Sequence, residues 1–379
     1  LPFGQTTANG NDSIRLSLLT CAPGEEIYSL FGHTAIRYED PANGIDAVFN
    51  YGLFSFNTPN FIFRFSLGET DYQLGATDYA HFAAEYAFDG RSVWQQTLNL
   101  SKEEKAELIR LLQENYRPEN RVYRYNFFYD NCATRPRDKI EESIIGKVIY
   151  PSEPQDGSRS FRDIVHQYCK GHPWARFGID LCIGSEADRP ITQRQMMFAP
   201  FYLMDAFAGA QIANDSIQRP LVSDKALIVD AVSDEEEGGW MPTPLQCSLL
   251  LFILTAAATI YSLRKRTGLW GVDLVLFGTA GIVGCVLAFL ALFSEHPAVS
   301  SNFLLLVFHP GQFLFLPYII YCVRKGKKCW YLTLNLIVLT LFIAFFPLIP
   351  QRFDFAVVPL ALCLLIRSAS NLILTSKKK

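Results

Sequence analysis

The sequence predicts an α+β extracytoplasmic domain followed by an all-α domain of five membrane-spanning helices. Three observations lead to this fold class. Apolar runs of about 20 residues fill the last third of the chain, Lys and Arg gather in alternate connections between those runs, and the first 241 residues mix short strand-like stretches with capped helical ones. We expect an extracytoplasmic domain at 1–213, a polar linker at 214–241 and a membrane domain at 242–379.

The first domain opens with short runs of strand character. Pro41, Asn43 and Gly44 supply a turn between the second and the third of them, which predicts that these two runs pair. The four expected strands lie at 15–20, 34–38, 45–51 and 92–100.

Two sequence signals mark the starts of helices in the same domain. Ser101 with Glu104, and Ser160 with Asp163, have the spacing of capping boxes, in which side chains satisfy the first free backbone N–H groups. A further helix is expected at about 132–145, closed by a glycine. Because strands and helices do not alternate regularly, the order favours an α+β domain over a doubly wound sheet.

The end of the first domain changes in character twice. Residues 195–213 are apolar and partly amphipathic, and we expect them to lie on the bilayer surface. Residues 214–239 then become polar and include the acidic run DEEE at 234–237. This composition predicts a tether that leads to the first membrane span.

Five apolar runs follow the tether. A hydrocarbon core about 30 Å thick needs about 20 helical residues at a rise of about 1.5 Å each, and every run has that length. A succession of such runs is not expected in a soluble protein. The runs lie near 243–263, 269–293, 302–323, 329–349 and 355–374.

The connections between these runs differ in positive charge. Those at 264–266 and 324–328 and the chain end at 377–379 hold 3, 4 and 3 Lys or Arg residues, whereas those at 294–301 and 350–354 hold 0 and 1. Positive connections stay in the cytoplasm, so this bias predicts an N-terminal domain outside the cell membrane and a cytoplasmic C-terminus. Such a topology needs an export signal, and we expect that one was removed ahead of Leu1.

Cys132 and His33 are the residues best suited to covalent chemistry. Cys132 lies in YDNCATR at 129–135, at the expected first turn of a helix, where a thiolate is stabilised. His33 lies in FGHTAIR at 31–37, at the start of a strand. A cysteine beside a histidine is an effective nucleophile for acyl transfer. A lone buried cysteine or histidine is more often structural, so the prediction depends on the two meeting in space.

A third polar group is expected to orient the imidazole. Asn50, on the strand after that of His33, is the favoured candidate, and Asp46 is the competitor. Either residue is also common in turns.

The other residues suited to chemistry are weaker candidates. Cys21 is either a second reactive thiol or a structural one, and Cys169 and Cys182 are close enough in sequence to form a disulfide. No zinc, nucleotide or serine-hydrolase motif is present, so we expect neither a metal nor another cofactor. The net charge of −3 gives no indication of a nucleic-acid partner.

Several of these motifs together resemble a known family. The segments CAPG at 21–24, FGHTAIR at 31–37, NYG at 50–52 and YNFFYDNCATR at 125–135 resemble the Lnb-type lipoprotein N-acyltransferases of Bacteroides relatives, over most of 15–205. A wider resemblance is to circularly permuted papain-like enzymes, which include lecithin-retinol acyltransferases. The resemblance implies a permuted papain-like fold for the first domain.

The resemblance also implies roles and partners. Cys132 would be the nucleophile, His33 the general base and Asn50 the polar third member, although this third position is often histidine in the acyltransferases. The acyl donor would be a membrane phospholipid and the acceptor a diacylated lipoprotein. Asn131 and Arg37, within the matching motifs, are expected to bind substrate. The protein would lie in the bacterial inner membrane with its catalytic domain in the periplasm.

Polar residues in the membrane half are further candidates. Glu295 and His296 lie at the outer ends of spans two and three and are expected to bind a lipid headgroup or shape a lipid entrance, with loop solvation and helix capping as the alternative. His309 is an ionisable residue about 10 Å into a span, a depth at which such residues are usually functional. Arg367, in the inner half of the last span, is expected to reach the cytoplasmic surface.

Two other functions remain open at this point. Papain-like domains commonly cut peptides, so a membrane-anchored cell-wall peptidase or amidase is the first alternative. Five spans are more than an anchor for such an enzyme needs. The second alternative is a membrane scaffold without catalytic activity, in which the cysteine and histidine are incidental.

Overall fold

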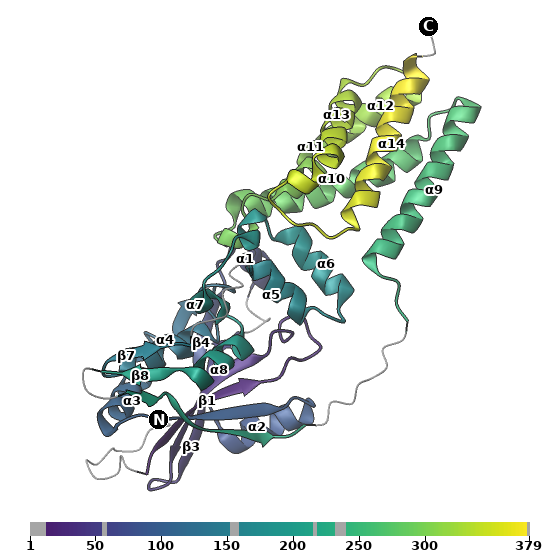
Figure 1. Cartoon of the computed structure of the whole chain (residues 1–379). Coiled ribbons are helices and arrows are strands. Elements are labelled where there is room, and N and C mark those ends of the chain that lie inside the picture. Colours follow the sequence, from purple (N-terminus) through teal and green to yellow (C-terminus); the bar gives the residue numbers. More distant parts are fainter. Residues whose placement is uncertain (1–12, 55–58, 152–158, 215–217, 232–239, 377–379) are drawn as a thin grey trace. The chain divides into compact units, whose positions relative to one another are not determined.

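The computed structural model describes residues 13–54, 59–151, 159–214, 218–231 and 240–376. These residues form two compact units (Figure 1). The first unit holds the residues up to Tyr168 and those from Pro190 to 231, and the second holds Cys169–Arg189 and the residues from 240 onward. The expected limit at 213 does not coincide with a boundary of the compact units, whereas the membrane domain expected at 242–379 falls within the second unit. The acidic run at 234–237 and the lysines at 377–379 lie outside the described residues.

A seven-stranded sheet is the centre of the first unit, in the order β10-β5-β1-β2-β3-β4-β6. Every neighbouring pair is antiparallel. The antiparallel pairing agrees with the α+β prediction, because parallel neighbours would need a crossover between each pair. The strands are β1 (Arg15–Cys21), β2 (His33–Asp40), β3 (Ile45–Leu53), β4 (Asp71–Asp78), β5 (Val93–Leu98), β6 (Val122–Arg124) and β10 (Val222–Val229).

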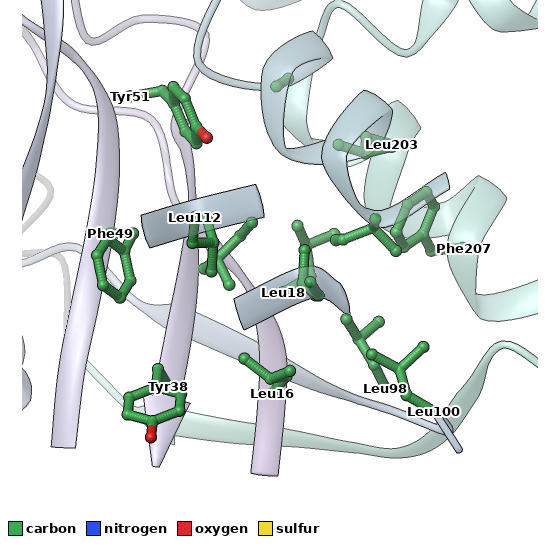
Figure 2. Close-up of a cluster of buried hydrophobic side chains, with 14 of the residues drawn as sticks. Leu16, Leu18, Tyr38, Phe49, Tyr51, Leu98, Leu100, Leu112, Leu203 and Phe207 are labelled. Carbon is green, nitrogen blue, oxygen red and sulfur yellow. The ribbon is translucent and has the colours of Figure 1, made fainter. Parts of the chain in front are cut away.

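One face of the sheet carries the larger apolar core (Figure 2). Alternate side chains such as Leu18, Tyr38 and Phe49 point to this face, as the two-residue period of a strand requires. Leu112 of α3 (Lys102–Tyr116) and Phe207 of α8 (Pro200–Gly209) pack against them. Each fully buried side chain of this size stabilises the fold by about 1.5–3 kcal/mol.

The stretch at 195–213 therefore does not behave as expected. It forms α7 (Gln193–Met196), α8 and the strand β8 (Gln211–Ala213), and its apolar side chains pack in the core of the first unit. The apolar face that suggested a bilayer contact is buried against the sheet instead. Periodicity alone does not tell a core-facing helix from one that lies on a membrane.

The opposite face of the sheet is covered by α2 (Tyr79–Phe88). Phe82 and Tyr86 of this helix pack on Cys21, Ala35 and Val48 of the strands. His33 and Asn50 belong to this face as well, because they lie two residues along their strands from Ala35 and Val48.

The sequence located most elements of the first unit. Strands β1, β2, β3 and β5 lie within two residues of the expected ranges, and Ser101 and Glu104 form the expected capping box of α3. The expected linker at 214–241 instead contains β10, which pairs with β5. The remaining elements are α1 (Phe61–Leu67), α4 (Thr134–Ser143), α5 (Phe161–Tyr168) and a small sheet of β7 (Lys147–Ile149), β8 and β9 (Gln218–Pro220).

The second unit is helical. Among the described residues, three helices are long and apolar enough to cross a membrane, and a fourth crossing is possible if the bent pair α12–α13, at 111°, is one span. The five expected spans are thus not confirmed by helix length. The helices are α6 (Pro173–Cys182), α9 (Pro244–Lys265), α10 (Trp270–Phe293), α11 (Pro310–Leu314), α12 (Leu316–Lys325), α13 (Trp330–Ala344) and α14 (Val357–Ser376), with short 3-10 turns η1 (Ser185–Asp188), η2 (Pro297–Val299), η3 (Phe303–Leu306) and η4 (Phe346–Leu348).

The run expected as the third span is divided into η3, α11 and α12. Pro310 begins α11, and a proline has no N–H group to continue a preceding helix. The side chain of Gln312 donates to the carbonyl of Val307 at 2.7 Å, which satisfies a backbone group left free by the break. A Cβ at Gly284 of α10 would lie 2.4 Å from the backbone N of His309, so this glycine permits the close contact.

Arg367 of α14 is fully buried and does not extend to a membrane surface as expected. Its guanidinium donates two hydrogen bonds to Asp273 of α10, at 2.8 and 3.1 Å, and one to Thr259 of α9 at 3.3 Å. Asn371 donates to the same carboxylate at 3.0 Å. A partner on a neighbouring helix makes burial of the charge possible, and no apolar pattern in the sequence reveals that partner.

The segment Cys169–Arg189 packs within the helical unit. Phe177 and Leu181 of α6 join its apolar core, and the indole of Trp174 donates to the carbonyl of Pro242 at 2.9 Å. Cys169 and Cys182 are both free thiols, so the disulfide that their spacing allowed is not formed.

Candidate functional site

His33 and Asn50 lie side by side at the ends of two paired strands. The Nε2 atom of His33 is 3.2 Å from the Oδ1 atom of Asn50. Because an amide oxygen only accepts, Nε2 carries the hydrogen and Nδ1 keeps its lone pair. In this tautomer the imidazole can accept a proton at Nδ1.

Asp46 has a different partner. Both of its carboxylate oxygens accept from Arg37, at 2.8 and 2.6 Å. The geometry thus favours Asn50 over Asp46 as the group that orients the imidazole.

Asn131 fixes the chain on either side of Cys132. Its Oδ1 atom accepts from the N–H groups of Ala133 and Thr134, at 2.8 and 2.9 Å, at the start of α4. Its Nδ2 group donates to the carbonyls of Phe127 and Phe198, at 2.7 and 2.9 Å. The whole amide is engaged within the protein, so Asn131 positions the thiol, and the geometry gives no support to the expectation that it binds substrate.

The thiol of Cys132 lies against the strands that carry His33 and Asn50. It accepts a hydrogen bond from the backbone N–H of Thr34, the residue after His33. A Cβ at Gly52, two residues after Asn50, would be 3.6 Å from the Cβ of Cys132. Gly52 has φ +92 and lies in an irregular register of β3 against β4. The fold therefore gathers Cys132, His33 and Asn50 at one end of the sheet.

The thiol and the imidazole are both neutral at physiological pH. Burial raises the pKa of the Cys132 thiol to about 11, although the N–H groups of Thr34 and of Cys132 itself favour the thiolate. Burial lowers the pKa of His33 to about 4, against the opposing effect of its hydrogen bond to Asn50. The expectation of a thiolate at rest is thus not met, since loss of hydration outweighs the stabilisation that a helix start provides.

Cys21 is a poor alternative nucleophile. It faces His33 across the β1–β2 pair and is fully buried. Burial raises its pKa to about 12, and it is hydrogen-bonded to Tyr86 of α2. A structural role in the core beneath α2 fits this environment.

Three tyrosines that were not among the predicted site residues lie near the thiol of Cys132. Tyr72 and Tyr123 are buried and Tyr125 is half-buried, and a charge on Cys132 would raise the pKa of each. The rings of Tyr72 and Tyr125 stack with centroids 4.1 Å apart. The alternation of Tyr123 and Tyr125 with polar residues was the signal that could have placed them together on one side of a strand.

A row of aromatic rings leads from these tyrosines to α1. Tyr72 packs on Phe54 at 5.1 Å between centroids, and Phe54 stacks on Phe61 at 5.5 Å. None of the residues in α1 is buried, and Ile62 and Phe63 are 79% and 55% exposed. An exposed helix of this composition is unusual on a water-soluble surface and is typical of an interaction site.

The other residues expected to bind substrate lie elsewhere. Arg37 binds Asp46 and Gln95 and lies 3.3 Å from the ring centroid of Tyr79, so its charge is compensated within the first unit. Glu295 and His296 belong to the second unit, in the connection between α10 and η2, where Glu295 is exposed and His296 half-buried. Among the described residues, no group of three or more His, Cys, Asp or Glu side chains is arranged to hold a metal ion.

Two family models match the chain. Residues 5–156 match the Lnb N-terminal periplasmic domain, and residues 235–379 match the Lnb transmembrane domain. No curated protein and no solved structure matches it. The two matches support a membrane protein whose N-terminal domain is periplasmic.

Proposed function

Because the chain belongs to the Lnb family, we propose that it is a lipoprotein N-acyltransferase with Cys132 as its nucleophile. The observation that carries the proposal is the arrangement of Cys132 beside the β2 start, where Asn50 holds the tautomer of His33 that can accept a proton at Nδ1. The order histidine, asparagine, cysteine along the chain suits a circularly permuted papain-like domain.

The first half-reaction forms a thioester. His33 removes the thiol proton as the sulfur of Cys132 attacks an ester carbonyl of a membrane phospholipid. A neutral pair requires this proton transfer to accompany the attack, since little thiolate exists beforehand. The carbon–sulfur bond forms, the ester carbon–oxygen bond breaks, and the lysophospholipid leaves with the proton from His33.

The second half-reaction transfers the acyl group to nitrogen. The α-amino group of a diacylglyceryl-cysteine at the lipoprotein N-terminus attacks the thioester carbonyl, and His33 takes a proton from this nitrogen. The nitrogen–carbon bond forms, the carbon–sulfur bond breaks, and the proton returns to the thiol of Cys132. The product is a triacylated lipoprotein, and the enzyme is regenerated.

The aromatic row supports a lipid as the acyl donor. The exposed side chains of α1, Ile62 and Phe63 among them, can insert at the level of the lipid ester groups, where aromatic side chains are favoured. The rings of Phe54 and Tyr72 then offer an apolar surface that continues toward the thiol. A polar cell-wall peptide has no acyl chain to pack against this apolar surface. The surface therefore favours acyl transfer over the peptidase alternative.

We further propose a topology for the membrane half. The five apolar runs of the sequence support five crossings. The Lys and Arg bias supports an N-terminal domain in the periplasm and a cytoplasmic C-terminus in the inner membrane. The loops at 294–301 and 324–328 then lie on opposite sides. A single cysteine added to each loop should react with an impermeant maleimide in intact spheroplasts only at 294–301. Labelling of the 324–328 loop under the same conditions would reject this orientation.

The product decides the function. Cells without this protein should carry lipoproteins with a free α-amino group, detected by mass spectrometry as an N-terminal lipopeptide lighter by one fatty acyl group. The wild-type gene should restore that mass, and a Cys132→Ala gene should not, whereas a Cys21→Ala gene should restore it. Unchanged triacylated lipopeptides in the deletion, with altered cell-wall fragments, would favour the peptidase instead.

A further inference from the structure

Tyr123 places a hydroxyl with no hydrogen-bond partner beside the nucleophile. The side chain is only 7% exposed, and its oxygen bonds to nothing within the described part of the chain. A Cβ at Gly52 would lie 3.9 Å from this oxygen and 3.6 Å from the Cβ of Cys132. The hydroxyl of Tyr123 and the side chain of Cys132 therefore both approach Gly52 of β3. A buried hydroxyl without a partner is destabilising, and its retention calls for a functional reason.

The backbone around Cys132 offers few donors for an oxyanion. The N–H groups of Ala133 and Thr134 donate to the side chain of Asn131, and the N–H of Asn131 donates to the hydroxyl of Thr134. The N–H of Arg135 donates to the carbonyl of Asn131. Within 131–135, the N–H of Cys132 alone has no acceptor outside its own residue among the hydrogen bonds described. An oxyanion at this place therefore needs a donor from another element.

We propose that the hydroxyl of Tyr123 donates a hydrogen bond to the oxyanion that forms when Cys132 attacks an acyl carbonyl. This inference rests on the proposed function, because it requires Cys132 to be the nucleophile. As the sulfur–carbon bond forms, the carbonyl π electrons move onto oxygen, and the hydroxyl stabilises that charge without giving up its proton. When the carbonyl re-forms, the ester carbon–oxygen bond breaks and the hydroxyl is free again.

The surroundings of Tyr123 suit a donor. Burial raises its pKa well above the usual range, so the hydroxyl keeps its hydrogen at every physiological pH. The guanidinium of Arg135 lies 3.5 Å from the ring centroid, and Asp130 holds that guanidinium with bonds of 2.6 and 2.8 Å. The cation fixes the ring and makes the hydroxyl a better donor.

The test compares two reactions of Cys132 in the full-length protein, purified in detergent. Acylation by a short-chain p-nitrophenyl ester passes through an oxyanion, whereas alkylation by iodoacetamide does not. Tyr123→Phe should slow the acylation of Cys132 by about 10²-fold and leave its alkylation within about twofold. Tyr51→Phe is the matched control, because Tyr51 packs edge-on against Tyr123 at 6.4 Å between centroids while its hydroxyl donates to Asn115. This control should leave both rates unchanged.

Each outcome decides the inference. Equal acylation in wild type and Tyr123→Phe would overturn it, and so would an equal loss of acylation and alkylation, which would show a general effect on the thiol. Failure of the wild-type Cys132 to be acylated at all would overturn it together with the proposed nucleophile. Acylation that depends on Tyr123, without N-acylation of a diacylated lipopeptide in phosphatidylethanolamine vesicles, would support the inference and reject the proposed function alone.

Discussion

Two polar clusters, one in each compact unit, have opposite designs. In the helical unit, Arg367 and Asp273 form a closed ion pair through two hydrogen bonds. In the first unit, Cys132 and His33 are held neutral by burial, and the neighbouring hydroxyl of Tyr123 has no partner. The first arrangement satisfies its polar groups by itself, whereas the second leaves a hydroxyl that, under the proposed function, a reacting group would engage.

The difference teaches how to tell structural from catalytic polar groups. A buried ion pair whose two members bond to each other contributes to a unique packing of helices. Removal of one member leaves the charge of the other buried without a partner. A group kept neutral and partly unsatisfied costs stability and is retained for chemistry. Changes in the two places should therefore separate cleanly into losses of stability and losses of activity.

The largest expected effect is on catalysis. Cys132→Ala and His33→Ala should each lower acyl transfer by about 10³-fold or more, and the double variant should be scarcely worse than either single one. Asn50→Ala should cost less, because it removes an orienting group and leaves the base in place. The measurement is acyl transfer to a diacylated lipopeptide, with thermal unfolding in detergent as the control. Additive losses in the double variant would show that the two residues do not act as a pair.

The next effect is on stability and belongs to the helical unit. Asp273→Ala should destabilise the protein by about 3–5 kcal/mol, because the guanidinium of Arg367 is then buried without its carboxylate. Asp273→Leu combined with Arg367→Met should recover most of this loss. Accumulation in the membrane and the unfolding temperature in detergent are the measurements. If the double variant is less stable than Asp273→Ala, the pair does more than cancel charge.

A smaller effect is expected where the broken helix meets α10. Gly284→Ala should destabilise the protein by about 1–3 kcal/mol, because its methyl group would overlap the backbone of His309. Gly271→Ala on the same helix is the matched control, since nothing lies within 4 Å of the added carbon. The control should be neutral or slightly stabilising. Equal unfolding temperatures for the two variants would mean that α10 and the segment at 309–313 move apart at little cost.

The pH dependence of two reactions of Cys132 tests the neutral pair directly. A thiol with a pKa of about 11 is ionised at only about one part in 10⁴ at pH 7. Alkylation of Cys132 by iodoacetamide should therefore rise about tenfold for each pH unit between 7 and 10. Acylation of Cys132 by a p-nitrophenyl ester, which needs no amine, should stay flat down to about pH 5, because His33, with a pKa of about 4, is still neutral there. An alkylation plateau from pH 5 to 8 would indicate a resting thiolate–imidazolium pair instead.

Local signals in the sequence predicted the local structure of the first unit. Alternation located β1, β2, β3 and β5, and the spacing of Ser101 and Glu104 located the start of α3. The three candidate catalytic residues also lie together, because each stands at a strand or helix end that a short motif identifies. The sequence failed where a property depends on a distant partner.

Three residues illustrate that limit. From the sequence, the charge of Arg367 is expected to reach the membrane surface. Its partner Asp273 lies 94 positions away, and no sequence pattern connects the two residues. In the sequence, Tyr123 does not differ from the other aromatic residues. Only the three-dimensional structure shows that its hydroxyl has no hydrogen-bond partner among the described residues. The resting charge of Cys132 is a third case. The sequence shows that the thiol lies near the start of a helix, but the burial that raises its pKa is seen only in the structure.

The path of the chain determines whether the first unit can be produced as a separate fragment. The chain leaves the first unit after Tyr168, joins the helical unit for Cys169–Arg189 and returns at Pro190. No single cut therefore releases the first unit alone, because a fragment that ends before residue 240 keeps α6 with its apolar Phe177 and Leu181 uncovered. Ser160 and Pro190 form a β-bridge, so the return point lies beside the start of α5, the last helix before the exit. A short glycine-rich splice in place of 169–189 is the design that would let the thiol-bearing half be produced, crystallised and assayed alone.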